Sequence, residues 1–348
     1  MNDNGQDQET KQLNLFRQVF GKADGSSDLS NVLMFWDSIP KYSVGLRQQS
    51  RMRDKSGKLP TVTHTFHYQG EECRVEITPA YIQDPTGEDT AYYPAATEEL
   101  IEDVLRKFLL DASLGSMLEG QGNEPQTLVR FSLKMIQREL RRIGKTRSIR
   151  EIKHALDVMV KSTLKIKRGK NRAHSDSILS SLTMVSREDL ETDPDAMCCA
   201  YFARPITQAI HSLAFRQLSY GRMMQHDSQL ARWLFRRLSY LYINASLTNT
   251  HTIKFSEINT ESGLLHHKRK LDRVKAVRRA LSELVESNTL YNFKENHELS
   301  GRTIKDYVFT LSPHHDFVSM MKAANARQKH IREAAAAGRI GSHMRRQI

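Results

Sequence analysis

The sequence predicts an α+β fold made of two tandem winged-helix domains behind a flexible N-terminal arm. Two observations predict this fold class. Helix-like and strand-like runs follow one another in the same order twice along the 348 residues, which suggests an internal duplication. In each copy a helical pair precedes a strand pair that carries basic residues, and this order of elements is that of a winged helix.

We expect five segments along the chain. A polar, flexible arm covers residues 1–30 and a linker covers residues 31–58. The first winged-helix domain takes residues 59–215, the second takes residues 216–315, and residues 316–348 form an Ala- and Arg-rich tail. The arm has too few apolar side chains to fold by itself.

Composition indicates a soluble globular protein with a polyanionic partner. Hydrophobic residues make up 39% of the chain, and Lys and Arg outnumber Asp and Glu by 52 to 40, which gives a net charge of +12. Such an excess favours nucleic acid. No apolar run approaches the length of a membrane span. Three cysteines cannot form a disulfide framework, so we expect reduced thiols and a cytoplasmic protein.

The first domain begins with a predicted hairpin. Residues 61–82 hold two β-rich runs around the turn residues Gln69 and Gly70. An amphipathic helix with an acidic first turn follows over residues 96–115, and residues 127–132 read as a short strand.

A helix–turn–helix comes next, over residues 133–144 and 148–162. The first helix ends on Gly144, a C-cap residue, and the second begins at Ser148, which has a capping-box partner in Glu151. The apolar stripe of the second helix consists of Ile149, Ile152, Leu156 and Met159. Off this stripe, expected to face outward and to contact DNA, are Arg147, Arg150, Lys153 and His154.

A first wing is predicted from strands over residues 163–168 and 177–186, joined by a basic loop over residues 169–176. The cations assigned to DNA contact here are Lys167, Arg168, Lys170 and Arg172. The alternative for this domain is an ordinary helical hairpin beside a sheet, with its charges on a solvated face.

The second domain repeats the order. A long helix over residues 227–245 precedes a strand and a short helix capped at Ser256, and then a helix over residues 266–287. The buried stripe of the long helix is Leu230, Trp233, Leu234 and Leu238, and that of the last helix is Leu271, Val274, Leu281 and Val285. A hairpin closes the unit, with a turn at Ser300-Gly301 and the alternating residues Tyr307, Phe309 and Leu311.

The last helix of this domain carries the strongest charge signal. Seven cations follow its start, interrupted only by Asp272, and they are Lys268, Arg269, Lys270, Arg273, Lys275, Arg278 and Arg279. At 100° per residue, Arg269, Arg273, Lys275 and Arg279 are predicted to point away from the core, where they could reach guanine edges and phosphates in a major groove. Arg302, in the hairpin turn, suits phosphates or the minor groove. The alternative is a solvated surface helix.

Catalysis, metals and cofactors are not expected. Gly144-Lys145-Thr146 resembles the end of a phosphate-binding loop but lacks the earlier glycine. The histidine doublets at 266–267 and 314–315 lack cysteine or acidic partners at ligand spacing. We therefore predict a binding protein that is not an enzyme, with no metal and no cofactor.

The arm contains one apolar cluster. Gln12-Leu13-Asn14-Leu15-Phe16 is similar to the Q-L-x-L-F peptide by which bacterial replication proteins dock on the sliding clamp. Leu13, Leu15 and Phe16 can fill an apolar pocket, and the Gln12 amide can bond at its rim. The alternative is that Leu13, Phe16 and Phe20 dock as one helical face on the protein's own core.

Together these features resemble the plasmid replication initiators with two winged-helix domains, nearest to the TrfA type. The resemblance covers residues 12–16 by motif and residues 59–313 by the order of elements. It implies binding to double-stranded DNA at origin repeats and opening of the adjacent duplex. It also implies four protein contacts: the sliding clamp, the host replicative helicase, the host initiator ATPase, and a second copy in a homodimer formed through the first domain. The alternative is a winged-helix transcriptional regulator without replication activity.

Overall fold

The computed structural model describes residues 28–83, 87–111, 113–119, 125–169, 172–185 and 196–336. The peptide at Gln12, Leu13, Leu15 and Phe16 therefore lies outside the described residues. In the described part, helices and strands form the predicted mixed fold, with a winged-helix unit in each half of the chain. No helix in these ranges combines the length and the apolar character that crossing a bilayer requires.

The helical part of the first unit contains α4 (Ala96–Leu109), α5 (Leu133–Arg142) and α6 (Ile149–Lys161). The predicted helix–turn–helix is confirmed, with α5 ending two residues before the predicted limit. α5 is followed by Gly144, whose φ of 73° favours glycine. At the start of α6, the Glu151 N–H donates to Ser148 Oγ at 3.2 Å and the Ser148 N–H donates to Glu151 Oε2 at 2.8 Å.

The predicted first hairpin is also confirmed, as β2 (Val62–Tyr68) and β3 (Glu71–Thr78). Gln69 and Gly70 both have positive φ, 52° and 79°, which suits a two-residue hairpin turn. β3 continues into a four-stranded sheet of order β2-β3-β8-β9, which includes β8 (Thr163–Arg168) and β9 (Arg172–Asp176).

The predicted strand pairing of the first wing is wrong. The partner of β8 is β9, which lies in the stretch predicted as a loop, and β8 itself is an inner strand. The next strand, β10 (Leu179–Thr183), pairs instead with β11 (Cys198–Phe202). These two belong to a sheet of order β10-β11-β7-β6, with β7 (Pro125–Phe131) and β6 (Gly115–Glu119). β9 is polar and short, so no local apolar alternation reveals it.

The second unit has the complete winged-helix order. Its elements are α10 (Gln229–Leu241), β13 (His251–Lys254), α11 (Phe255–Ser262), α12 (Lys270–Glu286), β14 (Leu290–Ser300) and β15 (Thr303–Pro313). The strand order is β13-β15-β14. Tyr307, Phe309 and Leu311 are buried, as the alternation predicts. Ser256 does not cap α11, because the cap position falls at Lys254 and the Ser256 N–H donates to Asp306 Oδ1 at 3.2 Å.

Residues 31–58, predicted as a linker, are part of the folded body. β1 (Leu29–Val32) pairs antiparallel with β12 (Arg216–Ser219), and two short helices follow, α2 (Met34–Ser38) and α3 (Leu46–Met52). Trp36 is buried, so the apolar residues of this stretch belong to the core. The core runs as one cluster through both units.

Part of the predicted tail also belongs to the folded body. α13 (His315–Ala336) contacts β12, and its Phe317, Met321 and Ile331 are buried. These apolar side chains recur at helical spacing and fix the helix to the body. The remaining elements are β4 (Ala80–Gln83), β5 (Asp89–Tyr92), α8 (Arg204–His211) and α9 (Tyr220–Met224).

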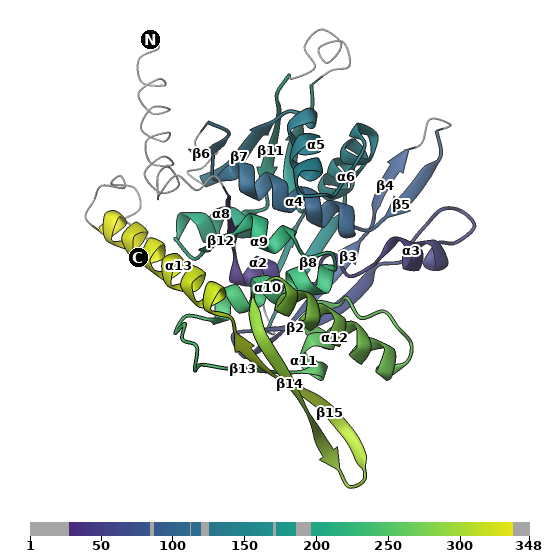
Figure 1. Cartoon of the computed structure of the whole chain (residues 1–348). Helices are drawn as coiled ribbons and strands as arrows, with labels where there is room; N and C mark the ends of the chain where they lie inside the picture. Colours follow the sequence, from purple (N-terminus) through teal and green to yellow (C-terminus); the bar gives the residue numbers. More distant parts are fainter. Residues whose placement is uncertain are drawn as a thin grey trace.

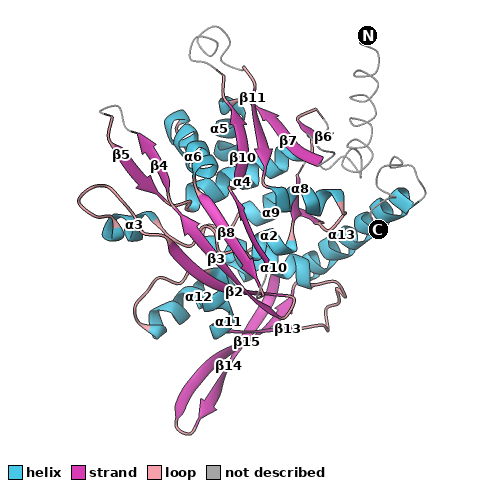
Figure 2. Ribbon diagram, turned by 180° about the vertical axis from the view of Figure 1, so that it is seen from behind, coloured by secondary structure: helices cyan, strands magenta, loops and turns pink. Residues whose placement is uncertain are grey.

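The helices and the β2-β3-β8-β9 sheet lie on different sides of the molecule. Figure 1 shows α4, α5, α6, α10 and α12 toward the viewer, whereas strands β2, β3 and β8 are in front in the reverse view of Figure 2. The β14–β15 hairpin extends away from the body (Figure 1). The second helix of each helix–turn–helix, α6 and α12, thus lies on the same side.

Candidate nucleic-acid interface

α12 presents a basic face to solvent. Val274, Val277, Leu281 and Leu284 are buried, and α12 packs with this side on α10 and β14. The opposite side carries Lys275, whose side chain is 73% exposed, and the exposed Arg279. Lys268 and Arg269 are also exposed, just ahead of the first turn. Among the described residues, no carboxylate lies within ion-pair distance of Lys268, Arg269 or Arg279.

The predicted face of α12 was rotated from the real one. Leu271 is 60% exposed, whereas Val277 and Leu284, which the predicted stripe omits, are buried. At 100° per residue this exchange turns the buried face by roughly 50°. As a result, Leu271 joins the exposed side next to Lys275.

Arg273 is correspondingly not an outward residue. Its Nη1 donates to Asn259 Oδ1 of α11 at 2.9 Å, and its guanidinium lies 6.0 Å from the ring centre of Phe255. Arg273 therefore holds α11 against α12 and does not point straight into solvent as predicted, while its DNA contact stays a prediction.

Two further cations of this helix contact other parts of the same unit at its surface. Lys270 Nζ donates to the Lys305 carbonyl at 2.8 Å and lies 5.4 Å from the ring centre of Tyr307. Arg278 forms a bidentate pair with Glu295 of β14, at 2.7 and 2.8 Å. These contacts fix the helix to the wing. Lys270, which the charge pattern also predicts to contact DNA, thus has a structural contact as well, and its DNA contact stays a prediction.

The turn of the second wing carries Arg302, which is exposed as predicted. Its neighbour Lys305 pairs with Glu298 at 3.1 Å, and Lys254 of β13 pairs with the same carboxylate at 2.8 Å. Among the described residues, no carboxylate lies within ion-pair distance of Arg302 at the end of the hairpin.

The predicted DNA-contacting residues at α6 in the first unit are less exposed than those at α12 in the second. Arg150 is exposed on α6, but Arg147 is half-buried and its Nε donates to Thr97 Oγ1 at 3.1 Å. Strand β4 packs on α6, and the His154 ring lies edge-on to Tyr92, 4.5 Å between centroids. Burial lowers the pKa of His154, so its imidazole is neutral near pH 7. Arg147, Lys153 and His154 are thus half-buried and face outward only in part, and their DNA contacts stay predictions.

The cations of the first wing have carboxylate partners on β3. Lys167 pairs with Glu76, and Arg168 Nε lies 2.6 Å from Glu71 Oε2. Because β8 is bonded to β3 along its length, this wing is part of a sheet and not a free hairpin. Lys170 lies outside the described residues, and of Arg172 only the backbone position in β9 is described.

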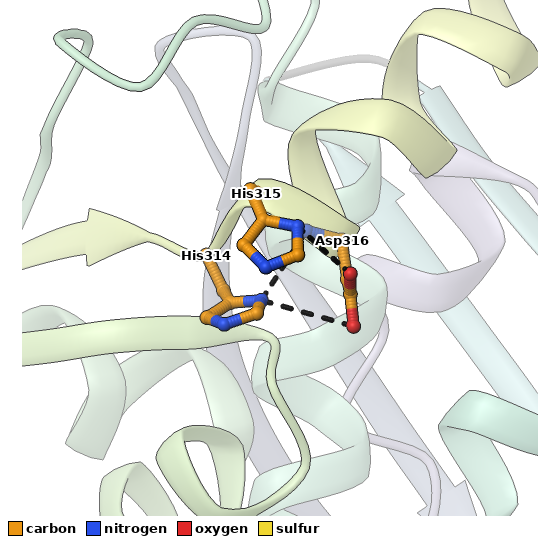
Figure 3. A group of neighbouring side chains, drawn as sticks. All are labelled: His314, His315 and Asp316. Atoms are coloured by element: carbon orange, nitrogen blue, oxygen red, sulfur yellow. Dashed lines mark hydrogen bonds and ion pairs between the residues drawn. The ribbon is translucent and has the colours of Figure 1, made fainter.

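The described residues hold one group with the composition of a metal site, His314, His315 and Asp316 at the start of α13 (Figure 3). The doublet thus has an acidic neighbour, contrary to the prediction. Asp316 Oδ2 pairs with Arg222 at 3.1 Å, and His314 Nδ1 accepts the Asp316 N–H at 3.2 Å. A guanidinium on the carboxylate and an occupied imidazole lone pair suit a helix cap better than a cation site.

A set of buried charges that the sequence reading missed joins the two units. We call Asp37, Glu99, Asp103, Arg106, Arg232 and Arg236 the interunit ion network. Arg236 of α10 forms ion pairs with Glu99 and Asp103 of α4 at 2.9 and 2.5 Å. Arg232 of α10 forms a second ion pair with Glu99 at 2.9 Å. Burial alone would raise the pKa of Glu99, but the two guanidinium groups outweigh it and lower that pKa.

Asp37 of α2 completes this network. Its carboxylate pairs with Arg106 Nη1 at 2.6 Å. Burial opposes ionisation, but the charge and hydrogen bonds of Arg106 prevail and lower the pKa of Asp37 to about 2. The acidic pattern of α4 indicated only a dipole effect at a helix start, and a buried partner from residue 236 is not visible in local sequence.

The fold and the open basic helix define a tandem winged-helix protein. No family model matches the chain, and no curated protein matches it. Two crystal structures of domains 2 and 3 of RctB are similar, both at 12% identity. The selenomethionine form has a TM-score of 0.47 and covers 79% of this chain and 99% of its own; the other has 0.44, 74% and 92%.

The crystal structure of the Pi initiator protein in complex with iteron DNA is similar at 14% identity, with a TM-score of 0.43. It covers 63% of this chain and 95% of its own. These similarities concern the path of the chain and not its side chains.

Proposed function

We propose that this protein is a non-enzymatic, sequence-specific DNA-binding protein that initiates plasmid replication at repeated origin sequences. The observation that carries the proposal is the solvent-facing basic side of α12 in a complete winged-helix unit. Lys275 and Arg279 lie on this side, with Lys268 and Arg269 ahead of it. A helix of this diameter enters a major groove, where Arg and Lys reach base edges and phosphates.

In this proposal the second unit reads the DNA sequence and the first unit has a smaller share of base contacts. Arg150 of α6 is available for phosphates, but β4 and β5 lie against the same helix. This arrangement leaves the first unit free for self-association, the role that the initiator resemblance implies. Arg302 of the second wing would contact phosphates or the minor groove.

The replication role rests on the arm. Gln12, Leu13, Leu15 and Phe16 match the clamp-docking pattern, and in this proposal they hold the bacterial sliding clamp at the origin. The host replicative helicase and the host initiator ATPase are the further partners, and the protein works in the bacterial cytoplasm on plasmid DNA.

The DNA part is tested by selecting duplexes from a random pool with the full-length protein. We expect a preferred sequence that recurs as direct repeats near the coding region. Recovery of no preferred sequence at moderate salt would contradict sequence-specific binding. Incubation of supercoiled DNA carrying the selected sequence with Mg²⁺ or Mn²⁺ should leave it uncut, and nicking would contradict the non-enzymatic proposal.

The replication part is tested separately. A peptide of residues 8–20 should bind the sliding clamp, and Leu15→Ala/Phe16→Ala should abolish that binding and impair plasmid replication. If the substituted protein supports replication normally while DNA binding is intact, the transcriptional regulator becomes the better description.

A further inference from the structure

The end of the β14–β15 hairpin carries two exposed aliphatic side chains. Leu299 is 62% exposed and Ile304 is 39% exposed, and they are direct cross-strand partners next to the turn. Side chains opposite one another on antiparallel strands lie on one face and touch. The pair, which we call the tip pair, therefore forms an apolar patch at the far end of a protrusion, with no core beneath it.

A register shift sets the face of the hairpin on which this patch lies. Tyr307 pairs with His297, and Glu298 pairs with Asp306, but the next rung joins Leu299 to Ile304 and leaves Lys305 as an extra residue. Such a bulge changes the side on which later residues emerge. Because Leu299 is two residues from His297, the tip pair emerges on the same face as His297 and Tyr307.

That face is the one that α12 occupies. Lys270 and Arg278 of α12 lie over the Tyr307 ring, 5.4 and 6.0 Å from its centre. Without the extra residue, Ile304 would emerge on the other side of the hairpin. The register shift therefore turns an aliphatic side chain toward the side of the molecule that carries the basic helix.

The hairpin also has the reach to touch a duplex bound there. The last rung that β15 shares with β13 joins Val308 to Lys254, and only two strands continue beyond it. At about 3.4 Å per residue, Ile304 lies roughly 13 Å past that rung. The β14–β15 hairpin as a whole protrudes from the body (Figure 1). The Lys270–Lys305 contact holds the first turn of α12 beside the base of this extension.

We propose that the tip pair is an apolar wedge that enters the minor groove beside the α12 site and partly unstacks one base step. This rests on the proposed binding of DNA by α12. Aliphatic side chains are the wedges that proteins insert between base pairs from the minor groove, and they kink the duplex as they do so. The exposed Arg302 in the same turn supplies a cation for the flanking phosphates. A locally unstacked step would assist opening of the duplex next to the site.

A second copy of the chain is the other occupant that an apolar tip could meet. Two tips brought together would also bring two Arg302 guanidinium groups together, without a described carboxylate to offset them. The charge of the turn thus favours DNA.

The test uses the full-length protein and a selected duplex in which 2-aminopurine replaces one adenine at a time. Unstacking raises 2-aminopurine fluorescence. With the wild type we expect a rise at one or two adjacent positions outside the α12 footprint. Leu299→Ala/Ile304→Ala should lose this rise and still bind the sequence, whereas Leu299→Met/Ile304→Met should keep it because the wedge remains apolar.

Tyr291→Ala is the matched control, since Tyr291 is an exposed apolar residue at the base of the same hairpin. It should leave the fluorescence rise unchanged. No rise at any position with bound wild type, or an undiminished rise with the alanine pair, overturns the wedge. Conversion of a dimer to a monomer by the alanine pair, seen by sedimentation, also overturns it in favour of a self-contact. Absence of any specific binding by the wild type would instead reject the underlying function.

Discussion

Leu271 is an apolar residue that is exposed on the basic side of α12. It stands on the solvent side of α12, one turn before Lys275, and follows Lys270 in the chain. An exposed leucine among basic residues gains nothing from water, but it matches the 5-methyl group that thymine presents in the major groove.

We therefore expect Leu271 to read a thymine. Replacing thymines of the selected site by uracil, one at a time, should weaken wild-type binding about fourfold at one position, since burial of one methyl group contributes ~0.8 kcal/mol. Leu271→Ala should show no loss at that position, measured by fluorescence anisotropy. A penalty that is the same in both proteins would remove Leu271 from the readout.

The contrast between Lys275/Arg279 and Arg273 gives a second prediction. Lys275→Ala/Arg279→Ala should weaken specific binding by about 1–3 kcal/mol for each base interaction that the substitutions remove, and it should leave the melting temperature unchanged, because both side chains are exposed. Arg273→Ala should lower the melting temperature, because it removes the hydrogen bond to Asn259. The reverse pattern would mean that the wrong face of α12 has been assigned.

At the scale of elements, the two wings differ in whether their cations have carboxylate partners. Lys167 and Arg168 of β8 are paired with Glu76 and Glu71, whereas Arg302 has no described carboxylate partner. A cation that already has a carboxylate releases few additional counterions when a phosphate approaches.

The salt dependence of binding should show this difference. Arg302→Ala should reduce the slope of log K against log salt by about 1, and Arg168→Ala should leave it nearly unchanged. The slopes can be measured by titrations between 50 and 200 mM salt. An equal reduction in both variants would indicate that β8 and β9 also contact phosphate.

Elements set by local chemistry were predictable from sequence, and those set by distant partners were not. The turn at Gln69-Gly70 and the Ser148–Glu151 capping box depend on neighbours along the chain, and both are present. The pairing of β9 with β8, and of β1 with β12, depends on long-range registers. The buried face of α12 was predicted wrongly for a related reason. Its seventeen residues offer two apolar stripes, and packing against α10 selects one of them.

At the scale of the whole molecule, the interunit ion network links the two winged-helix units. α4 of the first unit and α10 of the second are joined by Glu99 and Arg236, and Asp37 holds Arg106 beside them. Paired charges at such depth are costly to separate. The network thus favours a fixed separation between α6 and α12.

The acid stability of the protein should report on this network. The pKa of Asp37 is about 2 in the folded protein and about 3.9 when unfolded. Its stabilisation is therefore present above pH ~4 and is lost as the pH falls toward 2. Asp37→Asn should lower the free energy of unfolding by about 2–3 kcal/mol at pH 7, with the difference shrinking below pH ~4.

Urea unfolding from pH 7 to pH 2 measures this difference. Glu72→Gln, at a carboxylate that is 63% exposed, should follow the wild type throughout. A pH-independent gap between wild type and Asp37→Asn would mean that lost packing, and not the ionised carboxylate, accounts for the effect.

The central claim is that α12 lies in a DNA groove, and an iron chelate tethered to Ser282→Cys tests it most directly. Ser282 is exposed on α12, while the natural Cys73 and Cys198 are buried and Cys199 is half-buried. With the selected duplex bound, hydroxyl radicals from the chelate should cut both strands in one cluster across a single major groove of each repeat. Uniform or absent cutting by a protein that remains specifically bound would contradict the claim.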